Sequence, residues 1–471
     1  MYHKKIEKWM FKKIELWVLL IVIFAGIIFA FSFGVLVRQE IEGITKAGNI
    51  DISYLTKPAA RIARLPEKLA YHIFKNNPFI VSDPWDEKRK FNDQTGFVGA
   101  PNFKESYILL STYDGNLEDG KVELIDLTNF KVLHTWNPDI NAFNDLVDNI
   151  EKFKYLNRDD HDSRKILMHP NLTNDFGLLF GWNAPIRKID ACSDLIFQNT
   201  HNRFHHSIEL DVEGNIWAPT LMTPPSLPFE KVGNSFKDDA IVKMSAEGDI
   251  IFEKSVARIF IENGLEYLLF SIGGKGGNEN FNTDPTHLND IQPVDFDGNH
   301  WKKGDVFLSL RNLSMVLLYR PSTNEIIWKG TGPFSQQHDV DILDDHRISV
   351  FNNNTKIFKN GSVVNGNNEV IIYDFDTNEY SFYLKESLIE NDVRTIYQGT
   401  CQILTNGDLF VEETLGGRTL YFNADGSLRW SHVNSADDGS LYHVGWSRIL
   451  YTQDEIMLVK KFLGTKINCN D

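Results

Sequence analysis

Three histidines recur at corresponding places in a repeated sequence pattern. His206 lies eight residues before Gly214, and His338 lies eight residues before His346, which takes the same turn position in its own segment. His287 stands at the corresponding place in the segment between them, before a longer insertion. A neutral imidazole is a competent nucleophile near neutral pH, and a second imidazole can supply or accept a proton. If the segments are equivalent, the three imidazoles face one pocket.

Two further side chains suit the binding of an anionic group. Arg311 always carries its charge and offers a fork of donors to oxygen atoms, and Asn289 adds a neutral donor. Transfer of a group whose charge is spread over three oxygens depends mainly on positioning and on such fixed donors. Each residue also has a structural interpretation, since His338 could cap a strand and Arg311 could belong to an ion pair. His205 is expected to point to the opposite face of a strand from His206, by period-two alternation, and to have a structural or supporting role.

The elements that must position these residues are short strands joined by tight turns. Runs of β-branched and aromatic residues alternate with Asp-Gly, Glu-Gly and Asn-Gly turns, which is typical of hairpins. Six hairpins follow one pattern, in which the second strand ends in an aromatic residue: Trp136, Phe197, Phe252, Trp328, Phe382 and Trp430. Their spacing, about 50 to 75 residues, is close to the period of a four-stranded blade with loop insertions. The pattern predicts an all-β, six-bladed β-propeller over residues 101–465, with a pair of β-sandwiches as the alternative.

The histidines lie within a series of motifs that resembles the arylsulfotransferase family between about residues 205 and 354. The stretches that carry the resemblance are Asp284-Pro285-Thr286-His287-Leu288-Asn289, Phe307-Leu308-Ser309-Leu310-Arg311, Ile326-Ile327-Trp328-Lys329-Gly330, Gln336-Gln337-His338-Asp339-Val340 and Ser349-Val350-Phe351-Asn352-Asn353. That family consists of six-bladed propellers that move a sulfuryl group from an aryl sulfate ester to a phenolic acceptor. They act outside the cytoplasm, without 3'-phosphoadenylyl sulfate and without a cofactor.

The resemblance also implies roles for individual residues. His338 matches the histidine that becomes transiently sulfated, while His206, His287, Asn289 and Arg311 match the residues around the sulfuryl group. The expected catalytic residues are therefore His338, His287, His206 and Arg311, and the expected substrate-binding residues are Asn289, Arg311 and His206, with no metal. The proton is expected to move through His287 or His206.

Two other functions remain open on the sequence. Three histidines facing a channel could hold zinc, iron or copper in a metal-dependent hydrolase, although the guanidinium of Arg311 would repel a cation nearby. A propeller can also bind a ligand or partner without catalysis, because a fold does not imply a function.

The N-terminal region differs from the rest of the chain. Leu16 to Val37 is uncharged and long enough to cross a bilayer, and Lys4, Lys5, Lys8, Lys12 and Lys13 precede it. The positive-inside bias predicts a cytoplasmic N-terminus at 1–15, a transmembrane signal anchor at 16–37 and a periplasmic or otherwise extracytoplasmic propeller. A cleaved signal peptide is the alternative. Residues 38–100 are expected to form a neck with one short helix that begins near Pro66.

Composition limits the partners. The formal net charge of −16 argues against nucleic acid, because phosphates require a basic surface. The three cysteines, Cys192, Cys401 and Cys469, allow one disulfide at most and do not suggest the one found in some family members.

The segment from Gly273 to Gly277 is expected to form a loop over the mouth of the channel. Five further histidines are expected at the surface: His134, His169, His201, His300 and His432.

Overall fold

A computed structural model describes the chain in two compact units, residues 1–77 and 78–471. The described residues are 15–42, 46–47, 50–63, 94–147, 152–153, 156, 165–233, 235–270, 281–359, 361–467 and 469. The helix expected near Pro66 and the loop from Gly273 to Gly277 lie outside these residues.

The N-terminal unit contains one long apolar helix. This helix is α2 (Leu16–Glu42), and it is followed by β1 (Lys46–Ala47), β2 (Ile50–Asp51) and α3 (Ser53–Ala63). Leu16–Gln39 has a mean hydropathy of 2.9 and is not buried, so it is long and apolar enough to cross a membrane by length and composition. A signal sequence would meet the same criteria.

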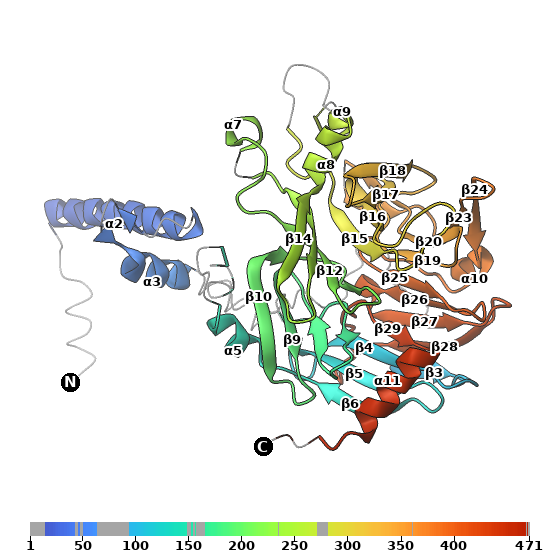
Figure 1. Ribbon diagram of the computed structural model, residues 1–471. Coiled ribbons are helices and arrows are strands. Elements are labelled where there is room, and N and C mark those ends of the chain that lie inside the picture. Colours follow the sequence, from blue (N-terminus) through green and yellow to red (C-terminus); the bar gives the residue numbers. More distant parts are fainter. Residues whose placement is uncertain are drawn as a thin grey trace, which may run out of the picture. The chain divides into compact units, whose positions relative to one another are not determined.

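The second unit is built from antiparallel sheets in a propeller-like arrangement (Figure 1). The first sheet has the order β29 (Arg448–Leu450), β4 (Tyr107–Asp114), β5 (Asp119–Asp126) and β6 (Lys131–Trp136). An eight-stranded sheet follows, with the order β14 (Ile250–Ser255), β13 (Asp239–Met244), β12 (Ile216–Leu221), β10 (Leu195–Phe204), β9 (Ala184–Ile189), β8 (Leu178–Phe180) and β7 (Asn171–Leu172), and with β11 (Glu209–Leu210) paired to β12.

The remaining sheets complete the arrangement. One is β15 (Leu288–Pro293), β16 (Val306–Leu310), β17 (Met315–Arg320) and β18 (Glu325–Gly330); the next is β19 (Val340–Ile342), β20 (Arg347–Asn352), β23 (Glu369–Asp374) and β24 (Glu379–Tyr383), with a small hairpin of β21 (Thr355–Phe358) and β22 (Gly361–Val364). The last is β25 (Thr400–Ile403), β26 (Leu409–Glu413), β27 (Arg418–Phe422), β28 (Leu428–Val433) and β3 (Gly96–Gly99). Helices connect or flank the sheets at α5 (Ile140–Asp145), α7 (Phe229–Val232), α8 (Val256–Glu262), α9 (Glu266–Phe270), α10 (Lys385–Glu390) and α11 (Gln453–Gly464).

Burial explains why central and outer strands differ in sequence. Every residue of β16 is buried, whereas exposure alternates along the outer strand β18. A strand covered on both faces needs a continuous apolar run, while an outer strand needs apolar side chains on one face only. The core between sheets joins residues from different sheets, for example Ile241 of β13, Ile291 of β15 and Leu317 of β17. These interfaces hold the inner strands in place around the site described below.

The two ends of the second unit are joined to distant strands. β3, which lies in the region expected to be a neck, pairs with β28, and Val98 faces Ser431. β29, near the C-terminus, pairs with β4, and Ile108 faces Ile449. A disulfide between Cys192 and Cys469 joins the segment after α11 to the turn between β9 and β10. Cys401 is a buried free thiol.

Two of the histidines expected at the surface are buried, and this part of the sequence analysis is wrong. His169 is 4% exposed and His432 is 9% exposed. His169 accepts a hydrogen bond at Nδ1 from the backbone N–H of Ile208, and its Nε2 lies 2.7 Å from Arg448. His432 packs against Phe97 of β3, so the added strand covers it.

Candidate active site

Three of the predicted site residues meet where the inner strands of neighbouring sheets begin. His206 precedes β11, His287 directly precedes β15, and His338 lies two residues before β19. The ring of His206 lies 5.3 Å from that of His287 and 5.9 Å from that of His338, measured between centroids. The structure therefore brings together three imidazoles that are far apart in the sequence.

The backbone revises the correspondence that spacing suggested. His206 and His287 have φ values of 59° and 51°, in the left-handed region, and the residue with this conformation before β19 is Gln336, at 58°. His338 comes two residues later and does not share this conformation. His206 and His338 therefore share a distance to the following turn but differ in backbone conformation. Left-handed residues other than glycine cost about 1 kcal/mol or more and gather at functional sites.

His338 is completely buried and is held at both ring nitrogens. Its Nδ1 lies 2.7 Å from Oδ1 of Asn353, and the amide of Asn353 donates to the carbonyl oxygens of Thr395 and Gln398. This network assigns the proton of His338 to Nδ1. Nε2 then carries the lone pair, and it accepts a 2.9 Å hydrogen bond from the backbone N–H of Gln398.

The charge state of His338 follows from its surroundings. Burial, and then the positive charge of Arg311, hold the pKa of His338 well below its usual value. The imidazole is therefore neutral near pH 7, which is the form that can act as a nucleophile.

His287 is paired with a carboxylate. Its Nδ1 lies 2.7 Å from Oδ2 of Asp284, and the same oxygen lies 2.9 Å from Nζ of Lys237. Burial alone would raise the pKa of Asp284, but the hydrogen bonds and charges of His287 and Lys237 outweigh it and hold that pKa well below its usual value. Asp284 is thus a carboxylate that orients the ring of His287 and leaves Nε2 available.

His206 has a different partner. Its Nδ1 lies 2.8 Å from Nδ1 of His205, and Nε2 of His205 lies 3.4 Å from a carboxylate oxygen of Asp239. Burial, together with the neighbouring His205, His287, His338 and Arg311, holds the pKa of His206 well below its usual value. The expectation that His205 points away from His206 is wrong. The two residues lie outside the strands, and the left-handed backbone at His206 breaks the period-two alternation.

Arg311 and Asn289 are placed differently from each other. Arg311 begins a 3₁₀ turn after β16, and its guanidinium lies 5.4 Å from the ring centroid of Tyr397. Its charge lowers the pKa of both His338 and His206, so it acts on the site. The side chain of Asn289 is completely buried and donates to the backbone carbonyl of Gln337, while its Oδ1 has no hydrogen-bond partner among the residues that the structure describes.

Several residues of this site were absent from the sequence analysis as functional candidates. They are Asp284, Asp239, Asn353, Gln398, Tyr397 and Trp446, whose ring centroid lies 6.3 Å from those of His206 and His338. Asp284 and Asn353 lie within the motifs quoted above, and this position was the signal that the sequence offered for them.

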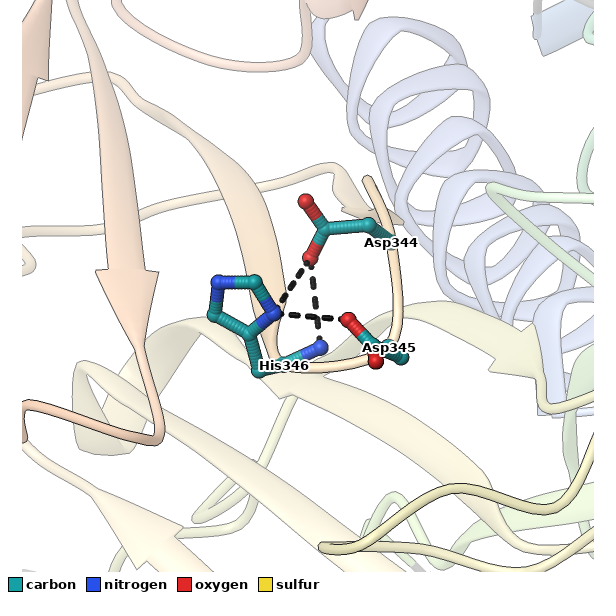
Figure 2. Close-up of side chains that lie close together, drawn as sticks. All are labelled: Asp344, Asp345 and His346. Atoms are coloured by element: carbon teal, nitrogen blue, oxygen red, sulfur yellow. Dashed lines mark hydrogen bonds and ion pairs between the residues drawn. The ribbon is translucent and has the colours of Figure 1, made fainter.

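A second histidine-containing cluster lies at the other end of β19. In the turn to β20, Nδ1 of His346 lies 2.7 Å from Asp345 and 3.4 Å from Asp344, and the three side chains face one another (Figure 2). Over the described part of the chain, this is the one group of three or more His, Cys, Asp or Glu whose possible ligand atoms all lie within 4.8 Å of one another. His206, His287 and His338 do not converge in that way.

Comparison with known proteins adds a family and distant structural similarities. Residues 168–435, more than half of the chain, match the family described as Arylsulfotransferase (ASST). No curated protein matches the sequence. Similar solved structures include a protein of unknown function from Bacteroides caccae, with 11% identity, a TM-score of 0.41, and coverage of 71% of this chain and 94% of that one.

Two others are a streptogramin B lyase and the WD40 propeller domain of Doa1. The lyase has 10% identity and a TM-score of 0.36 and covers 75% of this chain and 96% of its own. The Doa1 domain has 11% identity and a TM-score of 0.37 and covers 77% and 99%. All these TM-scores are below 0.5, so the description of the fold rests on the strand pairing given above.

Proposed function

Because the chain belongs to the arylsulfotransferase family, we propose that it moves a sulfuryl group from an aryl sulfate ester to a phenolic acceptor through a sulfohistidine at His338. The reaction uses no 3'-phosphoadenylyl sulfate and no cofactor. The observation that carries the proposal is the state of His338, a buried neutral imidazole whose Nδ1 proton is held by Asn353 and whose Nε2 keeps its lone pair.

The first half of the reaction forms a bond between Nε2 of His338 and sulfur. The S–O bond of the donor breaks, and its electron pair leaves with the phenolate oxygen. Before this step the N–H of Gln398 must stop donating its hydrogen bond to Nε2 of His338, so that the lone pair becomes free to attack. That N–H then lies where it can donate to an oxygen of the sulfuryl group, because fixed donors near developing charge favour such a transition state.

The other site residues support this chemistry in different ways. Arg311 offers a delocalised charge to the sulfuryl oxygens. The ring of His206 lies beside those of His287 and His338, so His206 and His287 are the candidates to exchange a proton with the phenol oxygens. Tyr397, beside Arg311, would offer an aromatic face to the aryl ring. Asn289 already donates one amide hydrogen to the carbonyl of Gln337, so we expect it to contribute less to sulfuryl binding than Arg311 does.

We further propose that the sheets form six blades. The eight-stranded sheet divides into two four-stranded meanders, β7–β10 and β11–β14, which are joined only by the short pairing of β10 with β12 at Arg203–Leu221 and Phe204–Thr220. A left-handed residue precedes the inner strand of each resulting blade: His169, His206, His287, Gln336, Gln398 and Trp446. This recurrence supports six equivalent units.

We propose that the propeller lies outside the cytoplasm, held by α2. The lysines before Leu16 support this orientation, and the Cys192–Cys469 disulfide suits an oxidising compartment. A protease added to intact spheroplasts should digest the propeller, whereas protection of the whole chain would overturn the topology.

The proposed function is tested on the full-length protein in detergent. After exposure to 4-nitrophenyl sulfate without acceptor, mass spectrometry should find one added sulfuryl group on His338, and a phenol should then release it. His338→Ala should remove both the modification and the transfer while leaving the thermal transition intact. A His338→Ala variant with normal transfer would show that the nucleophile is another residue. Complete loss of native activity in a chelator, restored by one added metal, would favour the metal-dependent alternative.

A further inference from the structure

Asp284, His287 and Arg311 form one connected unit. Besides the 2.7 Å contact between Asp284 and His287, the backbone N–H of Arg311 donates to the carbonyl of His287. The side chain of Asn312 accepts from Nε of Arg311 and donates to the carbonyl of Asp284. The carboxylate, the imidazole and the guanidinium are therefore fixed relative to one another before any substrate binds.

The three imidazoles of the site differ in what holds Nδ1. His338 faces the neutral amide oxygen of Asn353, and His206 faces another imidazole, that of His205. Only His287 among these three is hydrogen-bonded to a carboxylate. Its side chain is also 18% exposed, so a phenol oxygen can reach it.

A proton on His206 would be unfavourable for electrostatic reasons. It would lie near the guanidinium of Arg311 and beside the rings of His205, His287 and His338, and among the described residues no carboxylate is hydrogen-bonded to the ring. The positive charge of Arg311 disfavours a second positive charge nearby. A proton on His287 would instead be balanced by Asp284.

We infer that His287 is the residue that carries the proton of the transfer, and that Asp284 is the positioning residue that enables it to do so. This inference rests on the proposed function and chooses between the two histidines that the sequence left open. Asp284 itself does not touch the substrate, since its role is exerted through Nδ1 of His287.

His287 gives up one proton and takes one back in each turnover. It starts with a proton on each ring nitrogen. In the donor step, the phenolate that leaves sulfur takes the proton from Nε2 of His287, which becomes neutral and keeps its Nδ1 proton hydrogen-bonded to the carboxylate of Asp284. In the acceptor step, the incoming phenol gives its proton to Nε2 of His287 as its oxygen bonds to sulfur. The N–S electron pair returns to His338, and the enzyme regains its starting state.

The inference predicts a dependence on the leaving group. A good leaving group such as 4-nitrophenolate needs little protonation, whereas an unsubstituted phenolate needs it to leave. Asp284→Asn should therefore slow the first burst of phenol released from phenyl sulfate by about 100-fold, and the burst from 4-nitrophenyl sulfate by about threefold or less. Asp284→Glu keeps a carboxylate and should restore part of the phenyl sulfate burst.

A matched control exists elsewhere in the chain. His300 and Asp376 also form a histidine–carboxylate pair at 2.7 Å, but on the surface. Asp376→Asn should leave both bursts unchanged.

The outcomes are distinct. If Asp284→Asn slows both donors equally while folded by circular dichroism, the inference is wrong. If Asp284→Asn does not fold, His287→Gln and His206→Gln decide. A burst from phenyl sulfate that falls more than the burst from 4-nitrophenyl sulfate in His206→Gln, but not in His287→Gln, would assign the proton to His206 and overturn the inference. If His338→Ala keeps its burst, the proposed function fails first, and the inference fails with it.

Discussion

Asn353 presents a neutral amide oxygen to the proposed nucleophile, and Asn353→Asp tests how the transfer depends on that neutral partner. The native side chain accepts from Nδ1 of His338 and donates to two carbonyl oxygens, all within a buried region. The variant has almost the same shape but places a carboxylate 2.7 Å from the ring. It should convert a neutral imidazole into half of an ion pair.

The expected magnitude follows from that distance. A carboxylate in hydrogen-bond contact raises the pKa of a partner cation by about 1–3 units. The native pKa of His338 lies well below its usual value because of burial and Arg311, so native transfer should stay constant into the acidic range. Since only the neutral imidazole attacks sulfur, the acidic limb of Asn353→Asp should lie about 1–3 pH units higher, with about a tenfold loss of rate per unit below it.

Stability should also fall in this variant. The carbonyls of Thr395 and Gln398 lose their donor and then face a carboxylate. Leaving a buried polar group unsatisfied costs about 1–3 kcal/mol. The variant should therefore unfold at a lower temperature, and this measurement shows whether the kinetic assay can be run at the same temperature as for the native protein.

The assay is the burst of 4-nitrophenol between pH 5 and pH 9. This donor needs little protonation, so the profile reports on the nucleophile. Asn378→Asp is the control, because it makes the same change in the turn between β23 and β24, where the side chain accepts from the hydroxyl of Tyr373. A folded Asn353→Asp variant with the native profile would refute the assignment of His338 as the neutral nucleophile.

Three other predictions follow from the site and the fold. Arg311→Lys should slow transfer while still permitting sulfation of His338, because lysine keeps the charge but loses the fork, and Asn289→Ala should act more mildly on kcat. Burial raises the pKa of Asp339 to about 6 and that of Glu412 to about 7, so both groups bind protons more tightly in the folded state. Their contribution to stability is fully present below about pH 4 and is lost as the pH rises through 6 and 7. The unfolding temperature should therefore fall between about pH 4 and pH 7, and the fall should be smaller in Glu412→Gln. Cys192→Ser should lower the free energy of unfolding by about 2–4 kcal/mol and abolish the effect of a reductant on unfolding, whereas Cys401→Ala should leave the reductant effect in place.

Sequence spacing predicted the meeting of the three histidines because each precedes an inner strand by a short segment. Strand and turn residues carry a local signal, so the alternation and the Gly-containing turns located β11, β15 and β19 approximately. Placing those strands around one axis then predicted that His206, His287 and His338 lie close together. The assignment of roles to these residues stays a prediction.

The partners of the histidines could not be predicted in the same way. Asp239 reaches His205 from the start of β13, and Gln398 reaches His338 from the segment before β25. Such contacts depend on side-chain direction across two sheets, which no periodicity encodes. The left-handed backbone at His206 could not be predicted either, because only a few per cent of non-glycine residues adopt it and histidine, although enriched there, usually does not.

The pairing of the chain's ends has a consequence for the order of folding. β3 comes first in the second unit but needs β28, and β4 needs β29, so more than three hundred residues separate the partners. Contacts of such long sequence separation form late and slow the search for the native state. A chain synthesised from its N-terminus would keep the edges of β3 and β4 unpaired until its last strands have been made. Joining the ends of the second unit and opening the chain between β24 and β25, where no strand pairing is interrupted, would shorten the sequence separation in both pairings and should speed refolding.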